Sequence, residues 1–190
     1  MSKRSSWTIF LLILSLVMAS ICLAQKAPDV LQHPSCKYCG MDRDQFAHSR
    51  FLIEYDDGST FAACSIHCAA VDLAMNIDKM PKSMKVGDYN TKGLIDAEGA
   101  VWVLGGNKPG VMTKRAKWAF GNKEDAEKYV KENGGEVVTF ERAMQATYED
   151  MYADTKMIRE KRKAKRTGSQ ATGDPHQHGQ SHQHEQPKKQ

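Results

Sequence analysis

The chain has 190 residues, of which 41% are hydrophobic and 26% are charged, and its net charge is +4. This composition is typical of one globular domain or two very small ones, and not of a fibrous or wholly disordered chain. The basic residues in excess lie at the two ends, so the middle of the chain is slightly acidic. A nucleic-acid-binding protein carries its basic residues on the folded part, and we therefore expect no nucleic-acid partner.

Residues 1–24 have the pattern of a bacterial export signal. A basic start precedes the apolar run "WTIFLLILSLVMASICLA", which ends in small residues. The run is short for a membrane span, which needs about 20 residues, so we expect cleavage after Ala24 and a periplasmic protein. Acylation of Cys22 would give a lipoprotein instead, but Ile21 argues against it, because that processing requires a small residue before the cysteine.

A linker over residues 25–33 is expected to lead into a first unit, residues 34–95. "RFLIEY" and "TFAAC" flank the Asp-Gly turn "DDGS", so residues 50–64 predict a β-hairpin. Ser65 is predicted to cap a helix over "IHCAAVDLAMN", and Pro81 closes that segment.

The second unit is expected over residues 96–160. "LIDAEGAVWVLGG" and "AKWAF" each predict a strand, and Asn122 is predicted to start the helix "KEDAEKYVKEN", which Gly134 and Gly135 end. "EVVTF" predicts a further strand, and residues 140–160 a last helix. The order strand, strand, helix occurs twice, so the predicted fold class is α+β with two related units.

Residues 161–190 are predicted to be a disordered tail, because they contain no aliphatic residue larger than alanine. The basic run "KRKAKR" is either a solvated helix end or a contact for anionic lipid headgroups, which would give the protein a peripheral membrane contact. The tail also contains two His-x-His pairs, namely His176, His178, His182 and His184. Short His-rich tracts bind Cu(II), Ni(II) or Zn(II), so the tail is either a weak secondary metal site or only a solubilising segment.

Four cysteines lie in the first unit, as the pair in "CKYC" (Cys36 and Cys39) and the pair in "CSIHC" (Cys64 and Cys68). One pair precedes the hairpin and the other lies at the start of the helix, so we expect the fold to bring them together. Two close pairs separated by a hairpin are typical of a metal site. A helix start is also expected to stabilise the thiolate, which is the form that binds metal. Disulfide bonds in an exported domain are the alternative.

Met41 follows the first pair at once, and this favours copper. Cu(I) is soft and accepts thiolate and thioether ligands at low coordination number, whereas zinc rarely binds methionine. Cys39 and Met41 occupy alternate positions, so in an extended segment they share one side. The third ligand is left open among His67, Cys68 and Met112, and Cys36 and Cys64 complete the candidate metal ligands.

The segments "CKYCGM", "CSIHC" and "AKWAFGNKEDAEKYVKENGGEVVTFERA" together resemble the NosL family, over roughly residues 34–145. Cys39 to Cys68 is also similar to the small metal-binding motifs called TRASH or YHS. NosL proteins are exported copper-binding accessory proteins of nitrous oxide reductase. The resemblance implies two small ββαβ units, and it implies that Cys39 and Met41 bind Cu(I).

From the motif and the resemblance we expect an exported Cu(I) metallochaperone and not an enzyme. Its partner would be an apo cuproenzyme, and the resemblance makes nitrous oxide reductase the expected recipient. One alternative is a thiol–disulfide oxidoreductase that uses Cys36 and Cys39. Another is a structural zinc module, in which all four cysteines bind Zn(II) and the surface binds a partner.

Overall fold

The computed structural model describes residues 26–171. These residues fall into two compact units, one ending at Met151 and the other beginning at Tyr152. The first contains both β-sheets and every residue discussed below as part of the metal centre. Within residues 26–171, no helix has the length and apolar character that crossing a bilayer requires.

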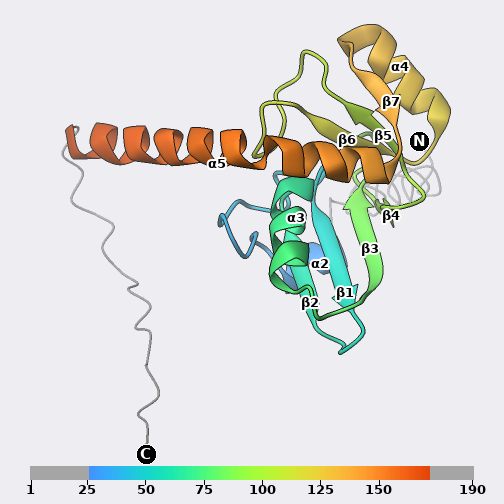
Figure 1. Cartoon of the computed structure of the whole chain (residues 1–190), viewed down its shortest axis with the longest axis horizontal. Coiled ribbons are helices and arrows are strands. Elements are labelled where there is room, and N and C mark those ends of the chain that lie inside the picture. Colours follow the sequence, from blue (N-terminus) through green and yellow to red (C-terminus); the bar gives the residue numbers. More distant parts are fainter. Residues whose placement is uncertain (1–25, 172–190) are drawn as a thin grey trace, which may run out of the picture. The chain divides into compact units, whose positions relative to one another are not determined.

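The first sheet has four strands in the order β2-β1-β3-β4, and all neighbours are antiparallel. The strands are β1 (Phe51–Tyr55), β2 (Thr60–Ala63), β3 (Pro81–Gly87) and β4 (Leu94–Asp96). Helix α3 (Ile66–Met75) lies against β1 and β2 (Figure 1). The predicted hairpin is confirmed, and Gly58 at its turn has a φ of +79°, which glycine adopts without strain.

The second sheet has three antiparallel strands in the order β6-β5-β7. The strands are β5 (Val101–Leu104), β6 (Lys117–Phe120) and β7 (Glu136–Val138), and α4 (Lys123–Asn133) packs against them. As predicted, α4 begins at Asn122, whose side-chain oxygen accepts the Asp125 N–H at 2.9 Å. It ends at Gly134, which has a φ of +74°. Both sheets therefore contain a ββαβ unit with the first strand between the other two, which confirms the predicted α+β class.

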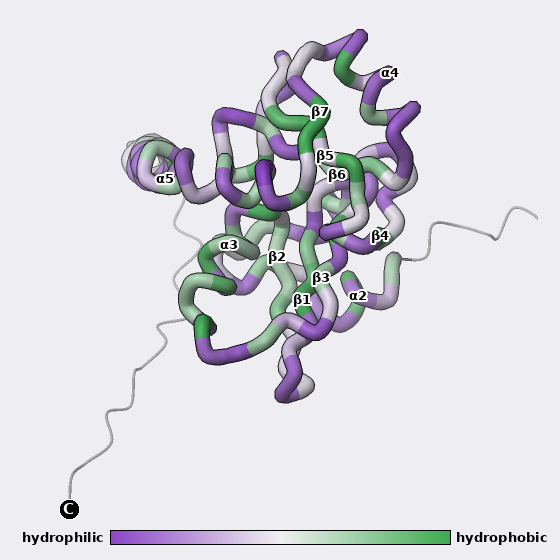
Figure 2. The backbone as a smooth tube through the Cα atoms, turned by 45° about the vertical axis from the view of Figure 1, so that its right-hand side comes forward, coloured by the Kyte–Doolittle hydropathy of each residue, from purple (hydrophilic) through white to green (hydrophobic). Residues whose placement is uncertain are grey.

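The two helices differ in how they contact their sheets. In Figure 2, α3 is largely hydrophobic, whereas charged residues make most of α4 hydrophilic. Six of the ten residues of α3 are buried, but only Ala126 and Tyr129 are buried in α4. The helix that carries Cys68 is thus part of the core, and its position is fixed by close packing.

Two strands differ from the sequence prediction. "LIDAEGAVWVLGG" was expected to be one strand, but β4 pairs with β3 in the first sheet, while β5 pairs with β6 and β7 in the second. The Asp96 carboxylate accepts the Gly99 N–H at 2.7 Å and forms the turn that separates them. Strand β3 was expected only from the family resemblance, because most of its side chains are at least partly exposed and no apolar run marks it.

The expected linker over residues 25–33 contains a short helix, α2 (Pro28–Gln32). Its Asp29 carboxylate lies 2.8 Å from Arg43 Nη2 and 2.8 Å from Arg50 Nε, and both arginine side chains are almost fully buried. Burial raises the pKa of Asp29, but the hydrogen bonds and charges of Arg50 and Arg43 outweigh it and hold that pKa below 3.8. These ion pairs hold α2 against the first sheet.

The last helix, α5 (Phe140–Ala171), is longer than predicted. Residues 161–171 were expected to belong to the disordered tail, but they are helical. The reason is that the Lys, Arg and Ala residues of 161–166 favour helix although they are exposed. The tail histidines His176, His178, His182 and His184 lie outside the described residues, as do the expected signal sequence and Cys22.

Candidate metal centre

Four cysteine sulfurs gather where the "CKYC" segment meets the start of α3. The Sγ atoms of Cys36, Cys39, Cys64 and Cys68 all lie within 4.8 Å of one another, and all four are free thiols. Cys39 and Cys64 are 3.4 Å apart, and Cys64 and Cys68 are 3.9 Å apart. Four sulfurs placed tetrahedrally about 2.3 Å from one ion lie roughly 3.8 Å from each other. The spacing therefore fits a single metal ion.

Cys36 and Cys39 lie on a tight turn. The Gly40 N–H donates to the Cys36 carbonyl at 2.8 Å, and the Cys36 N–H donates to the Met41 carbonyl at 2.9 Å. Gly40 has a φ of +74°, so a side chain at this position would be strained. After contacts with other cysteine side chains, the Cys39 backbone amide lowers the pKa of the Cys36 thiol, and the Met41 backbone amide lowers that of Cys39. The turn thus favours the thiolate forms of both sulfurs.

The second pair is positioned by the strand-to-helix connection. Cys64 directly follows β2, and Cys68 is the third residue of α3. The connection brings their sulfur atoms to 3.9 Å from each other. Ser65 occupies the predicted N-cap position with an extended backbone, but its side chain makes no capping hydrogen bond. The predicted position of the helix start is therefore confirmed, but the predicted side-chain cap is not formed.

Arg43 fixes the chain just before both cysteine pairs. Its side chain is fully buried and donates to the carbonyl of His33 at 2.7 Å and to that of Ala63 at 3.1 Å. His33 lies three residues before Cys36, and Ala63 directly precedes Cys64. Nothing in the sequence indicates this role, because an isolated arginine in "MDRD" looks like any surface residue.

The four thiols differ in acidity. Contacts with the Cys39 side chain, and then with those of Cys64 and Cys68, lower the pKa of Cys36. The Cys36 side chain raises the pKa of Cys39, but contacts with Cys64 and Cys68 and the Met41 amide outweigh this and leave it lowered. The Cys36 and Cys39 sulfurs raise the pKa of both Cys64 and Cys68. The lowered pKa values thus fall on the turn and the raised ones at the helix start, because contacts among the four sulfurs have the largest effect.

Accessibility also differs among the four. Cys36, Cys64 and Cys68 are at most 2% exposed, whereas Cys39 is only half-buried. An incoming ligand would therefore reach the cluster through Cys39.

The remaining candidate ligands lie in different places. His67 is buried, but its ring nitrogens are not part of the cluster of potential metal ligands. Within residues 26–171 that cluster consists of the four cysteines. Met41 follows the turn and packs, half-buried, against the core. Met112 is also half-buried against the core, with a φ of +63° that is unusual for a methionine. Metal binding by these three residues stays a prediction.

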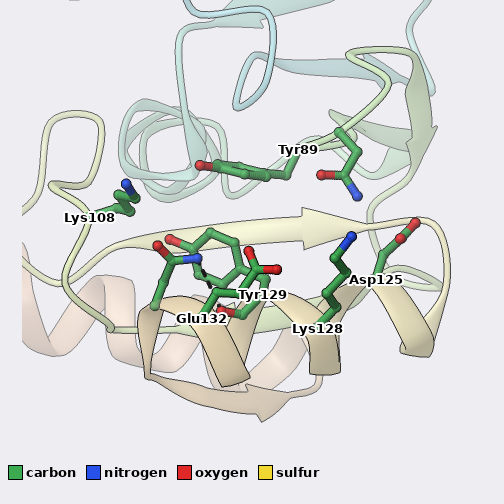
Figure 3. A pocket seen from close by; sticks show the side chains of 8 residues that line it. Tyr89, Lys108, Asp125, Lys128, Tyr129 and Glu132 are labelled. Carbon is green, nitrogen blue, oxygen red and sulfur yellow. Dashed lines mark hydrogen bonds between the residues drawn. The ribbon is translucent and has the colours of Figure 1, made fainter.

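A separate pocket of about 400 Å³ lies between α4 and the segment after β3 (Figure 3). Tyr89 and Tyr129 line it together with residues of both charges, among them Lys108, Asp125, Lys128 and Glu132. None of the residues that line it is a cysteine, methionine or histidine. It offers no soft ligand, so we do not connect it with the metal centre.

Comparison with known proteins bears on this centre. The family model described as NosL matches residues 28–148, which is well over half of the chain. The chain belongs to the NosL family. The match begins with α2 and covers all four cysteines, both sheets and the start of α5.

A crystal structure of the copper chaperone NosL from Shewanella denitrificans is similar, with 20% sequence identity and a TM-score of 0.49. The alignment covers 62% of this chain and 95% of that one. No curated protein sequence matches the chain.

Proposed function

We propose that this NosL-family chain is an exported carrier of Cu(I), which it holds at the four-cysteine cluster and passes to a cuproenzyme. The observation that carries the proposal is the cluster itself, in which four thiol sulfurs lie within 4.8 Å of one another. Sulfur ligands select soft ions, and Cu(I) is the softest of the common candidates. Membership of the NosL family supports this choice of metal.

The unequal burial of the cysteines suits transfer better than storage. Cys39 is half-buried, and Met41 lies two residues beyond it. Cu(I) accepts two or three ligands, so an incoming thiol or imidazole could replace Cys39 while the buried sulfurs keep hold of the ion. Transfer by ligand exchange needs no catalysis, and we infer that the protein is not an enzyme.

We infer the recipient from the family. NosL proteins are accessory to nitrous oxide reductase, so the apo form of that enzyme is the proposed acceptor, and the periplasm is the proposed compartment. We also propose that the tail histidines form a separate, weaker site for Cu(II) or Ni(II).

A structural zinc site is the second candidate, because four mutually close thiols are also the ligand set of a closed Zn(II) site. Such a site would have no use for Met41 and would be needed for folding. The redox alternative is disfavoured by the same cluster. A dithiol enzyme works with two sulfurs, and here the Cys39 sulfur lies against Cys64 of another segment.

Metal analysis separates these candidates. The protein should be purified anaerobically without an affinity tag, its metal content measured, and its metal-free form titrated with Cu(I) and with Zn(II) under reducing conditions. Tight Cu(I) binding in competition with a Cu(I)-specific chelator supports the carrier. Zinc retained at one ion per chain, together with failure to compete for Cu(I), would overturn it.

A further inference from the structure

A buried carboxylate joins the cysteine turn to the core. Tyr38, which lies between Cys36 and Cys39, donates its hydroxyl to Asp72 Oδ1 at 2.7 Å. Tyr55 of β1 donates to the other carboxylate oxygen at 2.6 Å. Asp72 is only 1% exposed, so both of its oxygens are bound within the protein. The carboxylate therefore has little freedom to rotate.

Asp72 belongs to the same helix as one of the metal-binding candidates. It lies on α3 four residues after Cys68, so the two side chains share one face of the helix. The turn thus meets α3 at two points, through the sulfurs at Cys68 and through the Tyr38 hydroxyl at Asp72. The Tyr38 ring also packs on Phe61 of β2, with ring centroids 5.1 Å apart.

Each of the two tyrosine hydroxyls donates one hydrogen bond to the Asp72 carboxylate. A hydrogen bond to a charged group is stronger than one between neutral groups, so the Tyr38–Asp72 contact limits movement of the short turn.

We propose that Asp72 is a positioning residue of the metal centre, which acts through Tyr38 to hold the cysteine turn against α3 and so sets how readily Cys39 leaves the metal. The inference rests on the proposed function, because release of copper requires Cys39 to move away from the buried sulfurs. Asp72 touches neither the metal nor an incoming ligand. It acts on the distance between the Cys36–Cys39 pair on the turn and the Cys64–Cys68 pair at the start of α3.

The test compares Tyr38→Phe with Tyr55→Phe. Each variant removes one hydroxyl that donates to the same carboxylate, but only Tyr38 lies on the turn. Loss of an outer contact to a metal site typically costs about 10–100-fold in affinity. We expect Tyr38→Phe to weaken Cu(I) binding and to speed transfer to a chelator by about tenfold, while Tyr55→Phe lowers thermal stability without changing either quantity.

A second metal makes the outcome independent of copper. Co(II) bound by thiolates has visible absorption bands that report the coordination geometry, and Tyr38→Phe should shift them while Tyr55→Phe should not. If the wild-type protein binds Co(II) but not Cu(I), the proposed function fails, yet the Co(II) spectra still test the positioning role. Identical affinity, transfer rate and spectrum in Tyr38→Phe and wild type would overturn the inference, and so would equal changes in both variants.

Asp72→Asn gives an independent check. In the Tyr38→Phe background it should add no further loss of metal affinity, because the contact through which it acts is already gone. An added loss of affinity in the double variant would contradict the route through Tyr38. If Asp72→Asn does not fold, the comparison of the two tyrosine variants still decides, since each removes only one oxygen atom.

Discussion

Cys39 and Cys64 are 25 residues apart in the sequence, yet their sulfur atoms lie 3.4 Å apart. A disulfide needs a sulfur–sulfur distance of about 2.05 Å, so only a small movement separates these free thiols from a covalent bond. In an oxidising compartment the metal-free cluster is therefore vulnerable, and bound metal would protect it.

We predict that diamide oxidises the metal-free protein first at Cys39 and Cys64. The two thiols lose their hydrogens to diamide and form one disulfide. We expect Cys39 to react first, because it is the most accessible of the four cluster thiols and has a lowered pKa. Peptide mapping by mass spectrometry would locate the bond, and the product should no longer bind metal. Protein loaded with Cu(I) serves as the control. A first disulfide between other cysteines would contradict the prediction.

Cys39→Ser and Met41→Ala should each lower the affinity for Cu(I) while the protein still folds. Both residues are only half-buried, so neither substitution leaves a large cavity. Competition with a Cu(I)-specific chelator measures the affinity, and circular dichroism checks the fold. Met84→Ala is the matched control, because Met84 is also half-buried against the core and is not a candidate ligand. Unchanged affinity in both of the first two variants would remove this pair from the copper site.

Zinc should not be required for folding. If the four cysteines formed a closed zinc site, the free energy of zinc binding would contribute to folding. Serine variants of each of the four cysteines would then unfold alike, and Met41→Ala would have no effect on folding. We expect instead that thermal unfolding of the metal-free protein is cooperative, and that Cu(I) raises the melting temperature more in the wild type than in Met41→Ala. Differential scanning fluorimetry with and without each metal would measure this.

The ion pairs of Asp29 predict a loss of stability in acid. Because the folded-state pKa of Asp29 is lowered below 3.8, its contribution is complete at neutral pH and is lost as the pH falls from about 3.8 through the folded-state value. Asp29→Asn should cost about 3 kcal/mol at pH 7, since it leaves two buried guanidinium groups without their counter-ion. Urea unfolding at several pH values would show the difference between variant and wild type shrinking below pH 3.8. A difference that does not depend on pH would contradict this assignment.

Deletion of residues 167–190 should leave Cu(I) binding intact. The soft ligands lie in the first unit, whereas the histidines of the deleted tail are expected to bind Cu(II) or Ni(II) only after losing a proton near pH 6.5. Titrations of the full-length and shortened chains at about pH 5.5 and about pH 7.5 would separate the two activities, because these values lie on either side of the imidazole pKa. Loss of Cu(I) binding on truncation would mean that the two sites are one.

Much of the fold could be predicted from local sequence signals. The Asp-Gly turn, the Asn122 cap and Gly134 each act within a few residues, and each has the predicted structure. Strand β3 could not be found in this way, because it is held by pairing with β1 and β4 and not by an apolar pattern of its own. The same holds for β4, whose three residues look continuous with the strand that follows.

The candidate site was predicted in composition but not in geometry. Spacing alone indicated that two cysteine pairs would meet, and they do. It could not show that the sulfurs of the turn would carry the lowered pKa values, because these depend on distances within the folded turn and to a segment 25 or more residues away. Asp72 and Arg43 were missed for the same reason, since their partners are distant in the sequence.

The contacts between the two sheets limit how the chain can be divided. Asp88, just after β3, accepts the Gly121 N–H at 2.7 Å, and the Tyr89 N–H donates to the Ala119 carbonyl at 2.8 Å. Both contacts join the cysteine-bearing half to the end of β6. Each half has a complete ββαβ order, but the cysteine-bearing half depends on backbone contacts with β6. Transferring it to another protein would therefore require β6, or a substitute for its backbone, to accompany it.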